Sequence, residues 1–152
     1  MDWTTLTASD LEGVMTTYEQ ELATVAPSPG TPDRVGPVLA NLVAEVRSMI
    51  ATWAPNTLSA DATKIPPGFK AQALIIARWR VLTAIPDYQQ EDGRKGEYDS
   101  ANAFFLQVAK GIIRPEPATD ALASTVPTEK PAGVQIISAP GSRTGRARMD
   151  GI

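Results

Sequence analysis

The chain of 152 residues contains neither cysteine nor histidine. Without cysteine it can form no disulfide bond and no thiolate metal site, which fits a protein made in a cytoplasm. Without either residue type there is no Ser-His-Asp triad, no thiol nucleophile and no imidazole metal site. Acid–base chemistry would need carboxylates with shifted pKa values, Lys or Tyr, and Mg²⁺ chemistry on carboxylates also remains open. These absences favour a protein that is not an enzyme and that carries no cofactor.

Long apolar runs are also missing. The longest, "ALIIA" at 73–77, is far below the ~20 residues that span a bilayer. The first residues, "MDWTTLTASD", carry an acid at Asp2 and no basic residue before an apolar stretch, so no secretory signal is predicted. Hydrophobic residues make up 43% and charged residues 20% of the chain, a balance typical of a globular domain. The sequence therefore predicts a soluble protein with no membrane partner.

Helical periodicity begins near the N-terminus. Residues 7–26 place apolar side chains three and four positions apart, and Ser9 is a suitable N-cap. Gly13 is a weak point in this helix, and "PSPGTP" at 27–32 ends it. The apolar positions are Leu11, Val14, Met15, Tyr18 and Leu22.

Three further helices are predicted. Asp33 can cap a helix that extends to Trp53, and the helix over 69–85 is apolar on nearly every side, as a buried central helix would be. A last helix over about 97–110 ends at Gly111. Four helices of this kind can bury one core.

The character of the chain changes after Arg114. Residues 115–152 contain five prolines and a single run of β-type residues, "GVQIIS" at 133–138. The fold class predicted is all-α: a small four-helix domain (residues 1–114) with a long extended C-terminal arm (residues 115–152) that holds one potential short β-strand. That strand could fold back on its own domain or add to the sheet edge of a partner. An all-α body offers no sheet edge, which favours the partner.

Two apparent binding motifs fail on inspection. A calcium-loop reading of the acids near residue 90 would need Gly at Asp92 and Glu at Tyr98, so a solvated loop is favoured. The segment 141–145 lacks the lysine and the following helix of a phosphate-binding loop. The acids concerned are Asp87, Glu91, Asp92, Glu97 and Asp99.

Arg78 and Arg80 interrupt the most apolar helix. Two positions apart, they point roughly 200° from each other, so at most one can share the buried side. One is expected to pair with a carboxylate of another helix while the other extends outward, and Trp79 is expected in the core. The alternative is that both contact a neighbouring subunit.

The C-terminal tail is basic within a chain of net charge −3. Arg143, Arg146 and Arg148 are offset by Asp150, and neutralising two or three phosphates gives only weak, salt-sensitive binding. The last aromatic residue is Phe105, so no ring is available in the arm for stacking on bases. A small helical nucleic-acid-binding or regulatory module that uses this tail is the alternative function.

Three stretches carry a family resemblance. They are "RVGPVLANLVAEVRSMIATW", "PPGFKAQALIIARWRVLTA" and "YDSANAFFLQVAKGIIRP", with "IARWR" and "AFFLQVAKGIIRP" the closest local likenesses. In their order, followed by an extended arm, the chain resembles the head-to-tail connector (adaptor, or head-completion) proteins of tailed bacteriophages, including the Mu-like group. The resemblance covers residues 7–115.

The resemblance implies a structural virion protein, made in the cytoplasm of a host bacterium. It implies a homo-oligomeric ring of twelve copies between the portal protein and a tail or neck (stopper or tail-completion) protein. DNA would pass through the channel without sequence-specific binding, and an acidic body would repel it as it passes. The arm would dock on the portal, and weak contacts repeated around a ring become strong. The arm residues assigned to this docking are Val134, Ile136, Ile137, Arg143, Arg146 and Arg148.

Overall fold

The computed structural model describes residues 1–24, 34–85, 88 and 92–121. Within these residues the chain forms five α-helices and one two-stranded antiparallel sheet, which confirms the predicted all-α body. The elements are β1 (Thr4–Thr5), α1 (Ala8–Glu12), α2 (Thr17–Thr24), α3 (Val35–Thr52), β2 (Lys64–Ile65), a 3₁₀ turn (Pro67–Phe69), α4 (Lys70–Thr83) and α5 (Asp92–Ala109).

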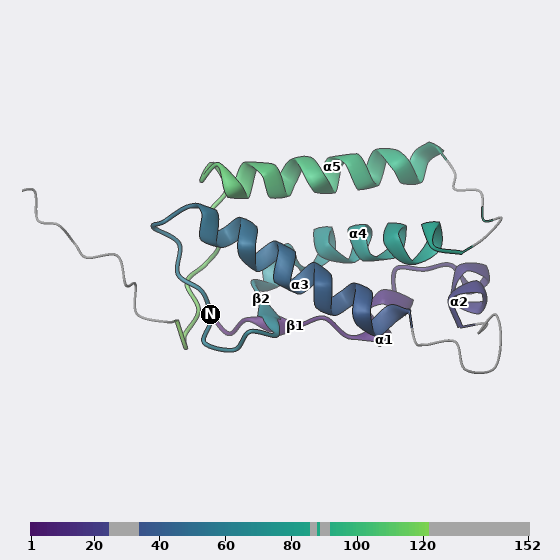
Figure 1. Cartoon of the computed structure of the whole chain (residues 1–152), viewed down its shortest axis with the longest axis horizontal. Coiled ribbons are helices and arrows are strands. Elements are labelled where there is room, and N and C mark those ends of the chain that lie inside the picture. Colours follow the sequence, from purple (N-terminus) through teal and green to yellow (C-terminus); the bar gives the residue numbers. More distant parts are fainter. Residues whose placement is uncertain (25–33, 86–87, 89–91, 122–152) are drawn as a thin grey trace, which may run out of the picture.

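Helix α4 is the centre of the body. It packs against α3 and α5, which also contact each other, and α1 and α2 lie against it (Figure 1). In Figure 1, α5 lies along the top, α3 crosses in front, and the small sheet lies below. Seven of the fourteen residues of α4 are buried, as its all-round apolar sequence predicted.

The apolar residues of α3, the helix predicted to extend from Asp33 to Trp53, form its inner face. Its buried residues are Leu39, Leu42, Val43, Val46 and Ile50. The structure places Arg34 at the N-cap position, without a side-chain cap bond. The predicted cap, Asp33, lies outside the described residues.

The first predicted helix is in fact two helices, α1 and α2. The N-cap of α1 is Thr7 and not Ser9, because the Thr7 hydroxyl accepts the amide of Asp10 (3.2 Å) while the Asp10 carboxylate accepts the amide of Thr7 (3.0 Å). A second such capping box follows, in which Thr16 and Glu19 exchange the same two bonds. The chain therefore turns after Gly13 and starts a new helix, which periodicity alone does not reveal.

The region 54–68, which lies between two predicted helices, contains β2. This strand pairs with β1, so that Thr4 faces Ile65 and Thr5 faces Lys64. Ile65 is fully buried and Trp3, just before β1, is 3% exposed, so the strands are held by the core beneath them. The all-α body therefore does carry a small sheet.

Helix α5 ends as predicted, at Gly111. The amide of Gly111 donates to the carbonyl of Val108 (2.9 Å) and that of Ile112 to the carbonyl of Gln107 (3.0 Å), the bonds of a Schellman motif. Gly111 has a φ of +73°, and a Cβ there would lie 2.3 Å from the ring of Trp53. The glycine thus both reverses the chain and leaves room for the indole.

Gly111→Ala should lower the free energy of unfolding by about 2 kcal/mol or more, since the left-handed backbone alone costs ~1–3 kcal/mol and Trp53 must move. Gly96→Ala is the matched control, because Gly96 lies within α5 with no atom within 4 Å of a new Cβ. That variant should be stabilised by ~0.5–1 kcal/mol. Urea unfolding measures both, and a Gly111→Ala protein as stable as wild type would contradict the motif.

Candidate functional site

A buried ion pair joins α2 to α4. The carboxylate of Glu19 accepts two hydrogen bonds from Nη2 of Arg78, at 2.5 and 2.7 Å. Glu19 is 4% and Arg78 6% exposed. Arg78 thus pairs with a carboxylate from another helix, as predicted for one of the two helix arginines; Arg80 pairs with a carboxylate as well, which was not predicted.

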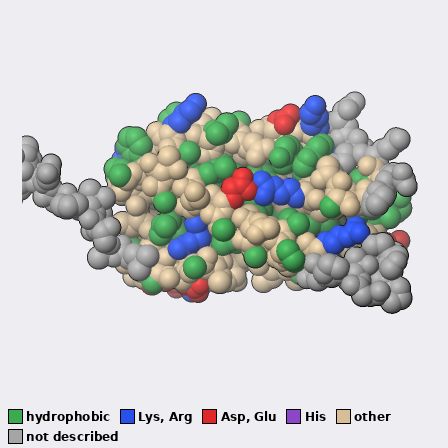
Figure 2. Space-filling view, in the orientation of Figure 1, with side chains coloured by type: hydrophobic (Ala, Val, Ile, Leu, Met, Phe, Trp, Pro, Cys, Tyr) green, Lys and Arg blue, Asp and Glu red, His purple; other side chains and the backbone are tan. Residues whose placement is uncertain are grey.

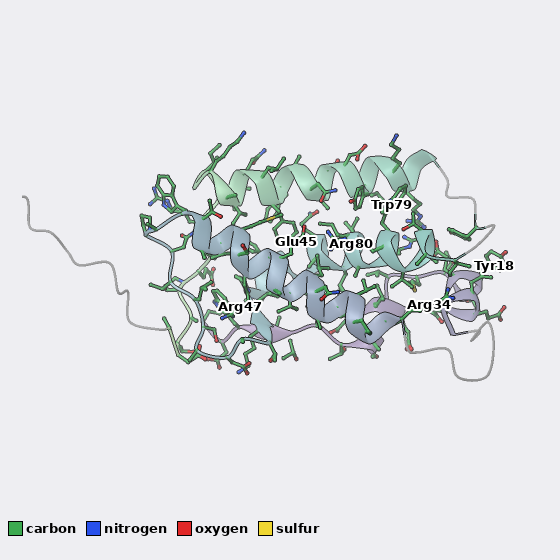
Figure 3. The ribbon with its side chains drawn as sticks, in the orientation of Figure 1. Tyr18, Arg34, Glu45, Arg47, Trp79 and Arg80 are labelled. Carbon is green, nitrogen blue, oxygen red and sulfur yellow. The ribbon has the colours of Figure 1, made fainter. Side chains whose placement is uncertain are left out.

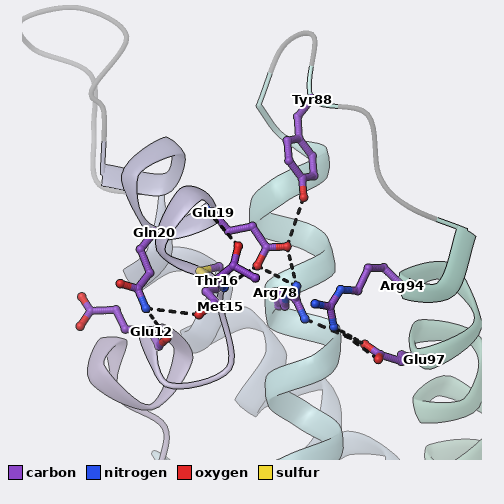
Figure 4. A network of polar contacts seen from close by, with 9 residues as sticks. All are labelled: Glu12, Met15, Thr16, Glu19, Gln20, Arg78, Tyr88, Arg94 and Glu97. Carbon is purple, nitrogen blue, oxygen red and sulfur yellow. Dashed lines mark hydrogen bonds and ion pairs between the residues drawn. The ribbon is translucent and has the colours of Figure 1, made fainter.

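Glu19 makes further contacts around the same carboxylate (Figure 4). Its Oε2 accepts the amide of Thr16 (2.7 Å) and its Oε1 accepts the hydroxyl of Tyr88 (3.1 Å). Burial by itself raises the pKa of Glu19, but hydrogen bonds from Arg78 and from Thr16 outweigh it and lower that pKa below its usual value. The carboxylate therefore stays charged and fully bonded inside the protein.

The other side of Arg78 faces α5. Its Nη1 lies 3.9 Å from the carboxylate of Glu97, which also accepts from Arg94 (3.1 Å), while Nε of Arg78 has no hydrogen-bond partner. The hollow beside these residues has a volume of about 10 Å³, the size of one water molecule. It is too small for a ligand, so this cluster is structural.

Arg80 also pairs, with Glu45 of α3 (2.6 Å), and Figure 3 shows the two side chains pointing toward each other. The hydrogen bond that Arg80 donates to Glu45 raises the pKa of Arg80 above its ordinary value. Both side chains are about one third exposed, 31% and 39%. Arg78 is enclosed within the chain, whereas Arg80 retains exposed surface. The role of both residues at a subunit interface stays a prediction.

Trp79, between the two arginines, is half-buried. Its ring stacks on that of Tyr98, and the two ring centroids lie 5.0 Å apart.

Arg47 of α3 organises the loop before β2. Its guanidinium donates to the carbonyls of Ser59, Asp61 and Lys64, each at 2.9 Å, and lies over the ring of Trp3. One planar group thus donates to three backbone carbonyls at once, a geometry that lysine cannot reproduce. Nothing in the sequence marks Arg47 for this role, since it is only a charged residue between the apolar positions of α3.

The first residues of the arm, the exit segment (residues 115–121), are bonded to this loop. The hydroxyl of the fully buried Ser59 donates to the carboxylate of Asp120 (2.8 Å), and the amide of Ala60 donates to the carbonyl of Asp120 (3.1 Å). The hydroxyl of Ser59 lowers the pKa of Asp120. Ala121 forms an isolated antiparallel bridge with Ser59.

The N-terminal residues hold the exit segment from its other side. The indole of Trp3 donates to the carbonyl of Glu116 (3.1 Å), and the amide of Thr119 donates to the carbonyl of Met1 (3.2 Å). The amino group of Met1 donates to the carbonyl of Pro117 (3.1 Å). The exit segment is therefore fixed between two parts of the body. The arm residues predicted to dock lie outside the described residues: Val134, Ile136, Ile137, Arg143, Arg146 and Arg148.

The exposed face of α3 carries no charge. Its exposed residues are Gly36, Pro37, Ala40, Asn41, Ala44, Ser48, Ala51 and Thr52. In Figure 2 the corresponding surface is mostly tan and green between Arg34, Arg47 and the Glu45–Arg80 pair, which Figure 3 labels in the same orientation. Depletion of charge on an exposed surface is typical of the centre of a protein interface.

An open groove of about 530 Å³ lies along the N-terminal half of α3. It separates α3 from the residues that follow β1 and those that precede β2. The nine lining residues that belong to the described part of the chain are uncharged: Thr5, Leu6, Ala8, Gly36, Leu39, Ala40, Val43, Ala62 and Thr63. Its size is in the range of binding pockets.

No family model, curated protein or solved structure matches this chain. In the described ranges no helix combines the length and apolar character that crossing a bilayer requires. Nor do three acidic side chains converge in a possible cation site anywhere in that part of the chain. The candidate sites among the described residues are the uncharged face of α3, the groove beside it and the exit segment.

The stability of the protein should fall as pH drops through the carboxylate range. Because the pKa of Glu19 is lowered on folding from its ordinary 4.5, its contribution is present above that value and is lost as pH falls toward the folded pKa. Glu19→Gln should be less stable than wild type at pH 7 by ~3–5 kcal/mol, since Arg78 is left buried and unpaired. Its stability should also depend less on pH below 5.

Glu97→Gln is the control for this comparison, since that side chain is 48% exposed and should keep the wild-type pH profile. Urea unfolding between pH 3 and 7 measures all three proteins. Equal slopes for Glu19→Gln and wild type would show that the buried pair does not set the acid sensitivity.

Arg47→Lys should detach the exit segment. One ammonium cannot serve three carbonyls in this fork geometry, so we expect a loss of about 2–3 kcal/mol in the free energy of unfolding. Exchange of the Ala60 amide, which donates to Asp120, should become faster than in wild type. Arg34→Lys is the control, because Arg34 makes a single long bond (3.4 Å) to the carbonyl of Ala84. Unchanged exchange at Ala60 would contradict this role.

Proposed function

We propose that this protein is a structural head-to-tail adaptor of a tailed-phage virion. In this proposal its copies form a ring, twelve in number by the family resemblance, that joins the portal to the tail or neck. The C-terminal arm docks on the portal, and DNA passes through the ring without sequence-specific contacts.

The anchored exit segment is the observation that carries the proposal. Hydrogen bonds to Met1, Trp3 and Ser59 fix the chain up to Ala121, so everything beyond starts from a defined point of the body. In a ring of copies, each arm that binds after the first does so within an assembly that is already attached, so weak contacts add up to tight binding. A rigid base with a projecting segment suits a protein that bridges two larger assemblies.

The uncharged face of α3 supports self-association. Eight exposed positions on one helix carry no charge, while the helix's two charged residues, Glu45 and Arg47, are bonded within the chain. A neighbouring copy could therefore cover this face without burying an unpaired charge. Arg80 lies beside that face, with its guanidinium partly exposed.

The test is binding to the portal ring encoded in the same genome. We expect the full chain to bind at physiological salt and a chain ending at residue 132 to bind at least ~100-fold more weakly, since it lacks the tethered contacts. A triple Arg143→Ala, Arg146→Ala, Arg148→Ala variant of the full chain separates the charged from the apolar part of the arm.

Random duplex DNA serves as the parallel ligand. Binding to duplex with a steep salt dependence, and none to the portal, would replace the adaptor with the nucleic-acid-binding alternative. Circular dichroism is the folding control for the shortened chain, which retains every described residue and should keep its helix content.

A further inference from the structure

The groove along α3 has a shape and a chemistry that suit an extended apolar segment. Its floor is formed by Leu39 and Val43, and small residues leave it open on the α3 side at Gly36 and Ala40. Covering this surface removes apolar area from water, while no charge would be desolvated. We propose that residues 133–138 of the same chain, "GVQIIS", occupy this groove in the free protein.

The exit point of the arm lies close to the groove. Ala121 pairs with Ser59, and the groove residues Ala62 and Thr63 follow Ser59 within the same loop. Residues 122–132 connect this point to the segment, and at ~3.3–3.6 Å per residue they reach up to ~35–40 Å.

The sheet supplies a partner for a further strand. It consists of β1 and β2 alone among the described residues, so each strand has an edge without a strand neighbour. Thr5 of β1 and Leu6 just after it line the groove, and a segment lying there can add to this edge. An all-α body without a sheet edge favoured an external partner for residues 133–138. The sheet of β1 and β2 supplies such an edge within the chain itself.

Within the arm, residues 133–138 have the composition that best suits the groove. In an extended chain Val134 and Ile136 point to one side and Ile137 to the other, so apolar side chains can meet both the floor and a wall. The stretch before it contains Glu129 and Lys130, and the stretch after it contains three arginines, which would have no carboxylate partner among the groove residues. The segment 133–138 is uncharged, like the groove.

Tethering favours the chain's own segment over that of a second copy. A connection of eleven residues within one chain gives an effective concentration on the order of millimolar, which a second copy matches only when it is equally concentrated. This inference concerns the free chain and does not depend on the proposed function. If both hold, the groove and the portal compete for the same segment.

The absence of cysteine allows a direct test with the full chain. Ala40→Cys places a thiol in the groove, and Ser138→Cys places one at the end of the segment without removing an apolar side chain. Ala51→Cys with Ser138→Cys is the matched control, because Ala51 is equally exposed on α3 but lies outside the groove, ~16 Å further along the helix.

In dilute protein we expect an intramolecular disulfide to form about 10-fold faster in the Ala40 pair than in the Ala51 pair, as docking raises the local thiol concentration. Adding Ile136→Asp and Ile137→Asp to the Ala40 pair should reduce its rate to that of the control. Equal rates for the two pairs, a rate insensitive to the aspartates, or disulfide-linked dimers as the main product would each overturn the proposal. Since no portal is present, a failure here leaves the adaptor proposal untouched.

Discussion

The position of α2 depends on one ion pair. Among the described side chains of this helix only that of Glu19 is buried, and Ala23 packs against the core while partly exposed. Its carboxylate caps the helix at Thr16 and pairs with Arg78 of α4, which means that one group both starts α2 and fixes it in place. The attraction within such a pair offsets the cost of burying both charges only at close range, so its geometry leaves α2 little freedom to shift.

Arg47 plays the matching role at the other end of the body. Where Arg78 holds a helix, Arg47 holds the backbone of a loop, and through Ser59 it reaches the exit segment. Two guanidinium groups thus connect the helical core to its surroundings, one through a carboxylate and one through carbonyls. The outer face of α3 carries no charged residue.

The long helices could be predicted from the sequence because their apolar periods are long, and the end of α5 is marked by Gly111. The start of α5 was predicted wrongly, at about residue 97, because the polar, glycine-containing residues from Asp92 onward are typical of a loop. The division of the first helix could also have been predicted, since Thr16 and Glu19 repeat the capping pattern of Thr7 and Asp10. The sheet could not, because β1 and β2 are two residues each and depend on contacts between distant parts of the chain. The same holds for Arg47, whose carbonyl partners belong to an irregular loop without a sequence signature.

The anchoring of the exit segment also determines how mechanical load enters the body. Tension applied along the arm acts first on the bridge between Ala121 and Ser59 and on the bonds of Asp120, and only later on the end of α5. Bonds from Trp3 to Glu116 and from Thr119 to Met1 share that load with the N-terminal residues. The helices are therefore shielded from a pull on the arm until these contacts have broken, so the arm can transmit force without unwinding α5.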